Sequence, residues 1–374
     1  MSEIKKIGIL TGGGDCSGLN AVIYAVTKTA ILKYGLEVVG FMRGYSGLYH
    51  KDFIPLTLQS VSGIMHTGGT ILKSSNKDNL FNFRVKENGE WVYKDVSQLA
   101  LDNLKEMGVD ALVILGGDGT LTSARDFGRR GLPVVGIPKT IDNDLPSTDV
   151  TFGYNTSLES ITDAIDKITT TAASHERIMI VEVMGRHTGW LAIEGGLAGG
   201  ADVIIIPEIP YNMDNVIKKI EERNRQGKNF SIIVVAEGAK EVGGSIHVRE
   251  RVEDSADQIR LGGVGGKIMA DLQKRLPNQE VRYSNLAYIQ RGGVTSQFDR
   301  VLGLQFGYSA IDLLMNGTFS HMVTYKDHTI KHLPLEEVVG HGEMGETSEG
   351  GTKLVNPNGL LVRTAKGLGI VFGD

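Results

Sequence analysis

The sequence predicts a doubly wound α/β protein with mainly parallel sheets, and three observations carry this prediction. Short runs rich in Val, Ile and Leu recur along the chain, as expected of strands that are buried on both faces. Longer stretches between them carry apolar residues at helical spacing. Glycines gather directly after several of the runs, where ligands bind in such folds. Strands and helices that alternate in this way indicate parallel sheets with helices on both faces.

The expected elements follow one another in order along the chain. We expect strands at residues 7–10, 36–41, 111–115, 133–137, 178–183, 202–206 and 231–236. We expect amphipathic helices at residues 18–32, 96–107, 155–171 and 214–225. No repeat or linker divides the sequence, so the chain is expected to cross between two lobes more than once. Residues 341–352 are polar and rich in glycine, which predicts an exposed loop.

The composition excludes several classes of protein. The chain has 374 residues and a net charge of −5, which gives no support for a basic nucleic-acid binder. Its single cysteine, Cys16, excludes a disulfide framework and the common zinc spacings. The apolar runs are too short for a secretory leader or for a membrane span of about 18 residues. We therefore expect a cytoplasmic protein with no nucleic-acid or membrane partner.

Glycine is unusually frequent, with 49 glycines in 374 residues, or about 13% against an ordinary usage of about 7%. No collagen-like period or low-complexity tract accounts for this excess. Glycines are therefore expected to serve turns and close approaches to a ligand. For one set we expect only turns and close helix packing: Gly195, Gly196, Gly199, Gly200, Gly262, Gly263, Gly265 and Gly266.

Two glycine-rich turns follow predicted strands in the first third of the chain. The first, TGGGD at residues 11–15, can present backbone N–H groups to a phosphate, although a tight strand-to-helix turn explains its glycines equally well. The second is GGDGT at residues 116–120, whose Asp118 suits Mg2+ or, alternatively, serves as a helix cap. GGDGT also occurs in NAD kinases and lipid kinases. It therefore indicates nucleotide phosphoryl transfer without fixing the acceptor.

The next predicted strand ends in PKTIDND at residues 138–144. Alternation places Asp142 and Asp144 on the same side, next to Lys139 and Thr140, which is enough for one general base and one metal contact. Asp-Asn-Asp is also common turn chemistry. Its position beside GGDGT at the strand ends favours a site, because a kinase mainly positions the acceptor hydroxyl and neutralises phosphate charge.

Positive groups for a second, anionic ligand occur in the later part of the chain. Arg177, Arg186, Arg282 and Arg291 have the planar fork that matches phosphate oxygens, although each taken singly is typical of a surface arginine. Glu237 directly follows a predicted strand and can accept hydrogen bonds from sugar hydroxyls. An ion pair between the lobes is the alternative for this residue.

These motifs together resemble the 6-phosphofructokinase family from Lys6 to about Thr318. They are LTGGGD, GGDGT, PKTIDND, VEVMGRHTGW, VVAEGA and IQRGG, in the family's order. The resemblance implies two Rossmann-like lobes, in which ATP with Mg2+ phosphorylates the C1 hydroxyl of fructose 6-phosphate in glycolysis. The donor lobe is expected at residues 1–153 plus about 292–320, and the sugar lobe at residues 154–291 plus about 321–374. A homodimer or homotetramer with shared active sites is also implied.

The same resemblance assigns roles to individual residues. Asp142 is the expected base, Thr140 and Arg186 are further catalytic residues, and Asp118 is the expected Mg2+ ligand with Asp144 as a second one. The expected donor-binding residues are Gly13, Gly14, Asn76, Lys77, Gly116, Gly117, Asp118, Gly119, Thr120 and Lys139. The expected sugar-phosphate residues are Thr140, Ile141, Asp142, Arg177, Met184, Gly185, Arg186, Glu237, Arg282, Tyr288 and Arg291. Of these, Arg177 and Arg282 match arginines that reach the 6-phosphate from a neighbouring subunit.

The choice of phosphoryl donor depends on two positions. Family members that use pyrophosphate typically carry Asp at the position of Gly119, where a carboxylate occupies and repels the α-phosphate of ATP. They also carry the lysine found here as Lys139, where many bacterial ATP enzymes have glycine. Gly119 favours ATP and Lys139 is compatible with both donors, so a pyrophosphate-dependent enzyme is the alternative.

Several positions depart from the family pattern. The arginine that usually bridges the donor and sugar phosphates is Asn76 here, and Lys73 or Lys77 is a possible substitute as a point charge. Tyr24 and Lys28 stand where regulated bacterial members have effector-binding arginines. Because of Asn76, a non-catalytic sensor of sugar phosphates or nucleotides is the alternative from another class of protein.

Overall fold

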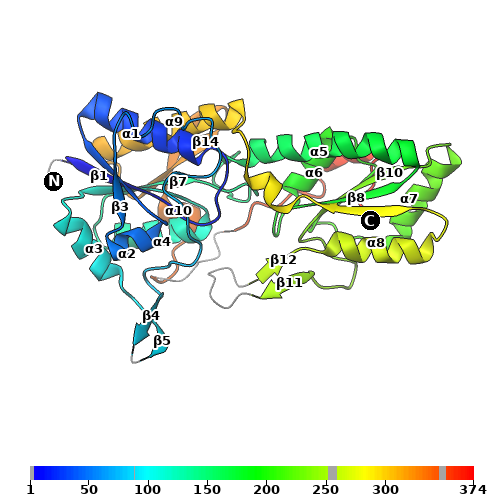
Figure 1. The fold of residues 1–374 in the computed structure, drawn as a ribbon, viewed down its shortest axis with the longest axis horizontal. Coiled ribbons are helices and arrows are strands. Elements are labelled where there is room, and N and C mark those ends of the chain that lie inside the picture. The colour runs from blue at the N-terminus through cyan, green and yellow to red at the C-terminus, as the bar shows by residue number, and fades with distance from the viewer. Residues whose placement is uncertain (1–3, 88, 252–258, 345–350) are drawn as a thin grey trace.

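Two separate sheets lie side by side along the long axis of the molecule, each covered by helices (Figure 1). This computed structural model describes residues 4–87, 89–251, 259–344 and 351–374. We call each sheet with its helices a lobe. The predicted doubly wound α/β class is confirmed, because the strands at the centre of both sheets run parallel and helices pack on both faces.

The first lobe contains a seven-stranded sheet in the order β15-β14-β7-β6-β1-β2-β3. Its strands are β1 Lys6–Thr11, β2 Glu37–Phe41, β3 Phe53–Leu56, β6 Ala111–Gly116, β7 Val134–Pro138, β14 His321–Lys326 and β15 Thr329–Pro334. The outer strands β3 and β15 are antiparallel to their neighbours, and the five between them run parallel. Every residue of β6 is buried, which explains its uninterrupted apolar sequence.

Alternation along β1 assigns the helices of this lobe to the two faces of its sheet. Ile9 belongs to the same core cluster as α1 (Leu19–Tyr34) and α9 (Gln297–Met315). Leu10 belongs to the cluster on the other face. That face is covered by α2 Tyr45–His50, α3 Ser97–Glu106, α4 Asp118–Arg129 and α10 Leu335–Val339.

The second lobe contains a four-stranded, fully parallel sheet in the order β13-β8-β10-β9. Its strands are β8 Ile178–Val183, β9 Val203–Ile205, β10 Ser231–Ala236 and β13 Val281–Asn285. The helices α5 Tyr154–His175 and α6 Trp190–Ala198 cover one face, and α7 Met213–Arg225 and α8 Val264–Arg275 cover the other. The smaller elements are β4 Phe83–Glu87, β5 Glu90–Lys94, β11 Val248–Arg251, β12 Ile259–Leu261, the 3-10 helix η1 Ala287–Arg291 and α11 Leu360–Gly367.

The predicted lobe boundaries need one correction. Residues 321–374 were expected in the sugar lobe, but β14 pairs in parallel with β7 (His321 with Val135), so residues 321–334 belong to the first sheet. The pairing occurs because β7 would otherwise leave a row of backbone N–H and C=O groups open at the sheet edge. Residues 353–374 do lie on the second lobe, where Val371 pairs with Val203. Along the described residues, the chain therefore passes from one sheet to the other three times.

Several glycines mark places where elements approach very closely. A Cβ atom on Gly307 of α9 would lie 2.6 Å from the Cβ of Ala25 on α1, so this helix pair packs against bare backbone. On α6, a Cβ on Gly195 would lie 2.5 Å from Ile161 of α5. A Cβ atom on Gly265, at the start of α8, would lie 2.4 Å from the ring of Tyr283. Close packing thus accounts for part of the glycine excess.

No helix in the described part of the chain is long and apolar enough to cross a membrane. Of the loop expected at residues 341–352, residues 345–350 lie outside the described residues. Residues 341–344 carry neither helix nor strand.

Candidate active site

Three loops meet at the carboxyl ends of the neighbouring strands β1, β6 and β7. The backbone N–H of Gly12 donates to the carbonyl of Leu115 at 2.8 Å, and the N–H of Lys139 donates to the carbonyl of Gly116 at 2.9 Å. The N–H of Gly13 donates to the carbonyl of Ser75 at 2.9 Å. The motifs around Gly13, Gly116 and Lys139 therefore lie side by side, with residues 74–76 against the first of them.

Thr120 fills the space between the two glycine turns. A Cβ atom on Gly12 would lie 2.7 Å from the Thr120 side chain, and one on Gly116 would overlap the same side chain. The hydroxyl of Tyr45 donates to the Thr120 carbonyl at 2.8 Å. Gly12 and Gly116 are thus needed to accommodate Thr120, an expected donor contact whose side chain also packs the two turns together.

The helix α4 begins at Asp118, directly after β6. Its first turn carries Asp118 and Gly119, and the backbone N–H groups at such a helix start attract anions. A Cβ atom on Gly119 would meet no heavy atom of the described residues within 4 Å, and this residue does not have a positive φ. The backbone at Gly119 is therefore exposed and has room for a side chain. Nothing in the fold itself requires glycine there.

Lys139 is buried beneath the first glycine turn. Its ammonium group donates to the carbonyl of Gly14 at 2.5 Å, and the residue is only 4% exposed. Burial lowers the pKa of Lys139, and the positive charge of Arg291 lowers it further. Arg291 contacts the same turn, because its Nη1 donates to the carbonyl of Asp15 at 2.9 Å. Two cations from different lobes thus hold one glycine turn.

Asp142 is a buried carboxylate in the loop after β7 with a raised pKa. It is 8% exposed, and its Oδ1 atom has no hydrogen-bond partner among the described residues. Its backbone N–H donates to Thr140 Oγ1 at 3.1 Å. Burial, and then the neighbouring carboxylate of Asp144, raise the pKa of Asp142 to about 6. A buried carboxylate with a free oxygen and a pKa near neutrality has the properties of a general base.

The loop after β8 brings residues of the second lobe next to Asp142. Thr188 Oγ1 donates to the carbonyl of Asp142 at 3.3 Å, and also to the carbonyl of Gly185 at 3.0 Å. The N–H of Met184 donates to Gln290 Oε1 at 3.2 Å. Gly185 has a φ of 133°, a conformation that side chains rarely adopt. This loop is therefore fixed by Thr188 and Gln290, two buried residues.

Glu237 lies across from Asp142, at the end of β10. It accepts a hydrogen bond from the backbone N–H of Arg186 at 3.2 Å. Burial, and then the negative charge of Asp142, raise the pKa of Glu237 to about 7. At neutral pH this group is therefore present in both the protonated and the ionised form.

Charges from both lobes converge on these loops. Burial and Asp144 raise the pKa of Asp118 to about 6, whereas Arg125 and Arg186 oppose the shift. Arg186 and Arg291 likewise lower the pKa of Asp142. The interacting group consists of Asp118, Lys139, Asp142, Asp144, Arg186, Glu237 and Arg291. Four carboxylates and three cations in one place can bind phosphate, a metal ion and hydroxyl groups.

Some expected site residues lie apart from this group. Arg177 and Arg282 both pair with Glu280 at the edge of the second sheet, and Arg177 Nε lies 2.9 Å from Glu280 Oε1. Tyr288 on η1 is 75% exposed. The side chain of Ile141 packs in the hydrophobic core, so only its backbone can face a ligand.

Asn76 and Lys77 lie beside the first glycine turn, because their neighbour Ser75 pairs with Gly12. Both residues are therefore close to the expected phosphate-binding backbone. The N–H of Lys77 donates to Ser75 Oγ at 3.2 Å.

Three supporting residues were not anticipated from the sequence. Thr188 lies within the motif VEVMGRHTGW and Gln290 within IQRGG. Only their place in these motifs could have indicated from the sequence that they support the site. Glu182 is 1% exposed and accepts hydrogen bonds from the N–H groups of Gly263 and Gly265, at 2.8 and 2.7 Å. Glu182 therefore connects the start of α8 to β8, two residues before Met184.

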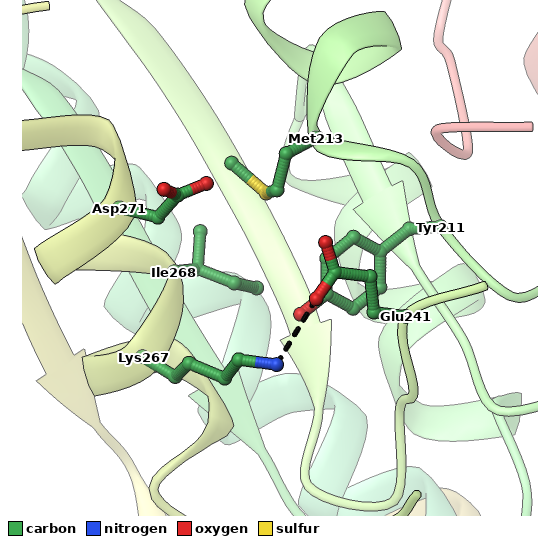
Figure 2. A pocket seen from close by; sticks show the side chains of 6 residues that line it. All are labelled: Tyr211, Met213, Glu241, Lys267, Ile268 and Asp271. Atoms are coloured by element: carbon green, nitrogen blue, oxygen red, sulfur yellow. Dashed lines mark hydrogen bonds and ion pairs between the residues drawn. The ribbon is translucent and has the colours of Figure 1, made fainter. Parts of the chain in front are cut away.

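A separate cavity of about 170 Å3 lies in the second lobe (Figure 2). Tyr211, Met213, Glu241, Lys267, Ile268 and Asp271 line it, and Lys267 pairs with Glu241 at 3.0 Å. None of the expected site residues lines this cavity.

Two doubly wound lobes that bring glycine turns, paired carboxylates and arginines together define a phosphoryl-transfer enzyme. The phosphofructokinase family model matches residues 6–314. The chain therefore belongs to the phosphofructokinase family. It is 56% identical to ATP-dependent 6-phosphofructokinase 2 of Clostridium perfringens, over all of both chains. It is 45% identical to the ATP-dependent 6-phosphofructokinase of Chloroflexus aurantiacus, over 100% of this chain and 99% of that one.

Solved structures agree with this membership. The T-state phosphofructokinase of Pichia pastoris is 32% identical, with a TM-score of 0.75, and the match covers 90% of this chain and 36% of that much longer one. The pyrophosphate-dependent enzyme of Marinobacter aquaeolei also has a TM-score of 0.75 over 98% of this chain and 92% of that one. At 21% identity, this second match concerns the fold alone.

Proposed function

We propose that the chain is an ATP-dependent 6-phosphofructokinase, which transfers the γ-phosphoryl group of ATP to the C1 hydroxyl of fructose 6-phosphate. The products are fructose 1,6-bisphosphate and ADP. The observation that carries this proposal is Asp142, a buried carboxylate with a pKa near 6 among cations from both lobes, one of whose oxygens has no partner in the described part of the chain. Relatives named ATP-dependent 6-phosphofructokinase match the whole chain and support the same reaction.

In the proposed reaction, Asp142 accepts the proton of the C1 hydroxyl as that oxygen attacks the γ-phosphorus. The bond from the γ-phosphorus to the bridging oxygen breaks, and ADP leaves with the electron pair. Thr140 orients Asp142 through the hydrogen bond to its backbone, and Arg186 neutralises charge on the transferring group. The glycine turns at residues 12–14 and 116–119 would cradle the donor phosphates with backbone N–H groups.

The carboxylates of this site fit a magnesium ion. Burial, and then repulsion by the carboxylate of Asp144, raise the pKa of Asp118, and a divalent cation would relieve that repulsion. Within the described residues no cluster of three or more His, Cys, Asp or Glu side chains is arranged to hold a metal. This agrees with Mg2+, which uses one or two carboxylates and completes its shell with water and phosphate oxygens. When bound, the ion would neutralise charge on the donor phosphates.

On the sugar side, we propose that Met184, Gly185, Arg186, Glu237 and Arg291 bind fructose 6-phosphate. The ionised form of Glu237 would accept hydrogen bonds from sugar hydroxyls. Arg177 and Arg282 would bind the 6-phosphate of a neighbouring copy, in a cytoplasmic homo-oligomer with shared sites. Their common partner Glu280 is exposed enough to exchange for a phosphate.

Pyrophosphate is the second candidate donor, because Lys139 is compatible with both donors. The deciding experiment measures turnover of fructose 6-phosphate with ATP and with pyrophosphate side by side, in the presence of Mg2+. Turnover with ATP alone supports the proposal, and turnover with pyrophosphate alone overturns the choice of donor. Binding of fructose 6-phosphate without turnover with either donor would instead establish a sensor. The same pair of assays on Asn76→Arg measures what the missing arginine contributes.

A further inference from the structure

The C-terminal segment at residues 353–374 lies outside the part that the family model matches, residues 6–314. Its end is anchored on the second lobe. Val371 pairs with Val203 of β9, and Phe372 is completely buried. The helix α11 of this segment packs against α6. The segment thus forms an integral part of the second lobe.

Its first described residues reach back to the loop that carries Asp142. The backbone N–H of Lys353 donates to the carbonyl of Asp144 at 2.8 Å. The carbonyl of the same residue accepts a hydrogen bond from Trp190 Nε1 at 2.6 Å. Trp190 begins α6, four residues after Arg186. Lys353 therefore bridges the acidic loop after β7 and the helix that follows the sugar-side loop.

The side chain of Lys353 holds the acidic loop at a second point. Its ammonium group donates to the carbonyl of Asp149 at 2.6 Å and to that of Thr148 at 3.2 Å, and it lies 5.2 Å from the centre of the Trp190 ring. Burial lowers the pKa of Lys353, while Asp149, Glu194 and Asp144 attract its charge. A partly desolvated ammonium group makes stronger bonds to carbonyls than an exposed one does.

A neighbouring contact fixes the direction of the segment. The N–H of Val355 donates to Glu208 Oε1 at 2.9 Å, and the N–H of Gly189 donates to the same oxygen at 2.9 Å. Glu208 follows β9, and Gly189 precedes α6. Lys353 therefore extends from a fixed point of the second lobe.

We infer that Lys353 is a positioning residue for phosphoryl transfer: through its ammonium group on the carbonyls of Thr148 and Asp149, the C-terminal segment holds the loop at residues 142–149 in register with the sugar-side loop. This inference rests on the proposed function. Lys353 touches neither reacting group, and its role is to keep the base and the acceptor hydroxyl at a productive distance. Loss of such alignment lowers turnover more than it lowers binding.

Lys353→Met tests this role, because it removes the ammonium group and keeps both backbone hydrogen bonds. We expect kcat to fall about tenfold or more while both KM values change by less than about threefold. Lys353→Arg should restore most of the turnover, since a guanidinium group can also donate to two carbonyls. Lys366→Met is the matched control, because Lys366 lies on α11 of the same segment and pairs with Asp374. It should leave kcat unchanged.

Hydrogen exchange on the free proteins gives a readout that does not depend on activity. Amides of residues 142–149 should exchange about tenfold faster in Lys353→Met, and at the wild-type rate in Lys366→Met. If Lys353→Met does not fold, Lys353→Gln takes its place in both measurements. Wild-type kcat in the folded variant, or equal losses in Lys353→Met and Lys366→Met, would overturn the inference. If the wild type itself had no turnover, the proposed function would fail, and the exchange rates would still decide the positioning role.

Discussion

Replacing Gly119 by Asp should impair the use of ATP without impairing the fold. Within the part of the chain that the structure describes, a Cβ atom there meets nothing within 4 Å, and the φ of this residue is not positive. An acidic residue in the first turn of α4 would even stabilise this helix by about 0.3 to 1 kcal/mol. The melting temperature should therefore stay the same or rise slightly.

The expected loss in activity follows from charge repulsion. A carboxylate at position 119 and a donor phosphate roughly 6 Å away repel each other by about 3 kcal/mol at an effective dielectric constant of about 20. The exposure of Gly119 to water reduces this value. We therefore expect kcat/KM for ATP to fall by a factor of about 10 to 100. The new charge would also oppose ionisation of Asp118, whose pKa is already raised to about 6.

The assay compares Gly119→Asp with Gly119→Asn, which has nearly the same size and no charge. Initial rates with ATP and with pyrophosphate, together with melting temperatures, are measured for both variants and the wild type. The asparagine variant should retain most of its activity with ATP. Undiminished ATP use by Gly119→Asp would refute the reasoning, and an equal loss in Gly119→Asn would show that size, not charge, excludes the nucleotide.

Three further predictions concern the carboxylates. Asp142→Ser should lower kcat by about 10^2 to 10^4 with nearly unchanged substrate affinities, and steady-state kinetics showing normal turnover would reject Asp142 as the base. The wild-type kcat/KM should fall as the pH drops below about 6, because protonated Asp142 cannot accept a proton. The dissociation constant of fructose 6-phosphate, measured at the same pH values, corrects for ionisation of the sugar phosphate. A corrected profile that stays flat to pH 5 would contradict the assignment of Asp142 as the base. Glu237→Gln should stabilise the ligand-free protein by about 2 kcal/mol more at pH 8 than at pH 5. The pKa of Glu237 is about 7 in the folded protein and lower in the unfolded chain. The stability contributed by the protonated carboxyl is therefore lost as the pH rises through 7. Denaturant unfolding at the two pH values measures the difference, and an equal effect at both would argue against the raised pKa.

The central strands could be predicted because their environment is encoded locally. All seven apolar runs form strands, and those at β6, β8 and β10 are buried along their whole length. The polar strands at the sheet edges gave no such signal. β13, with the sequence VRYSN, and β15, with TIKHLP, face partly toward water and lack a continuous apolar run. Their place depends on pairing with distant residues, which a local pattern does not contain.

The candidate site also contains some residues that could be predicted from local sequence and others that could not. The motifs around Asp118, Lys139 and Asp142 follow neighbouring parallel strands, so their proximity could be expected from the rule for strand ends. The structure brings them together, and their roles in catalysis stay predictions. Thr188 and Gln290 act through hydrogen bonds to backbone groups, which no residue pattern specifies. Lys353 could not be foreseen either, because its contacts join segments about 160 and 200 residues away.

The discontinuous first sheet also affects how this chain is made. β7 is synthesised long before β14, since His321 pairs with Val135 across almost half of the sequence. During translation β7 is therefore an open, apolar edge strand, which is a template for association with other chains. The second lobe is synthesised between these two strands, and its parallel sheet can form before the first is complete. A chain that terminates before residue 321 would thus carry one nearly finished lobe and one aggregation-prone edge.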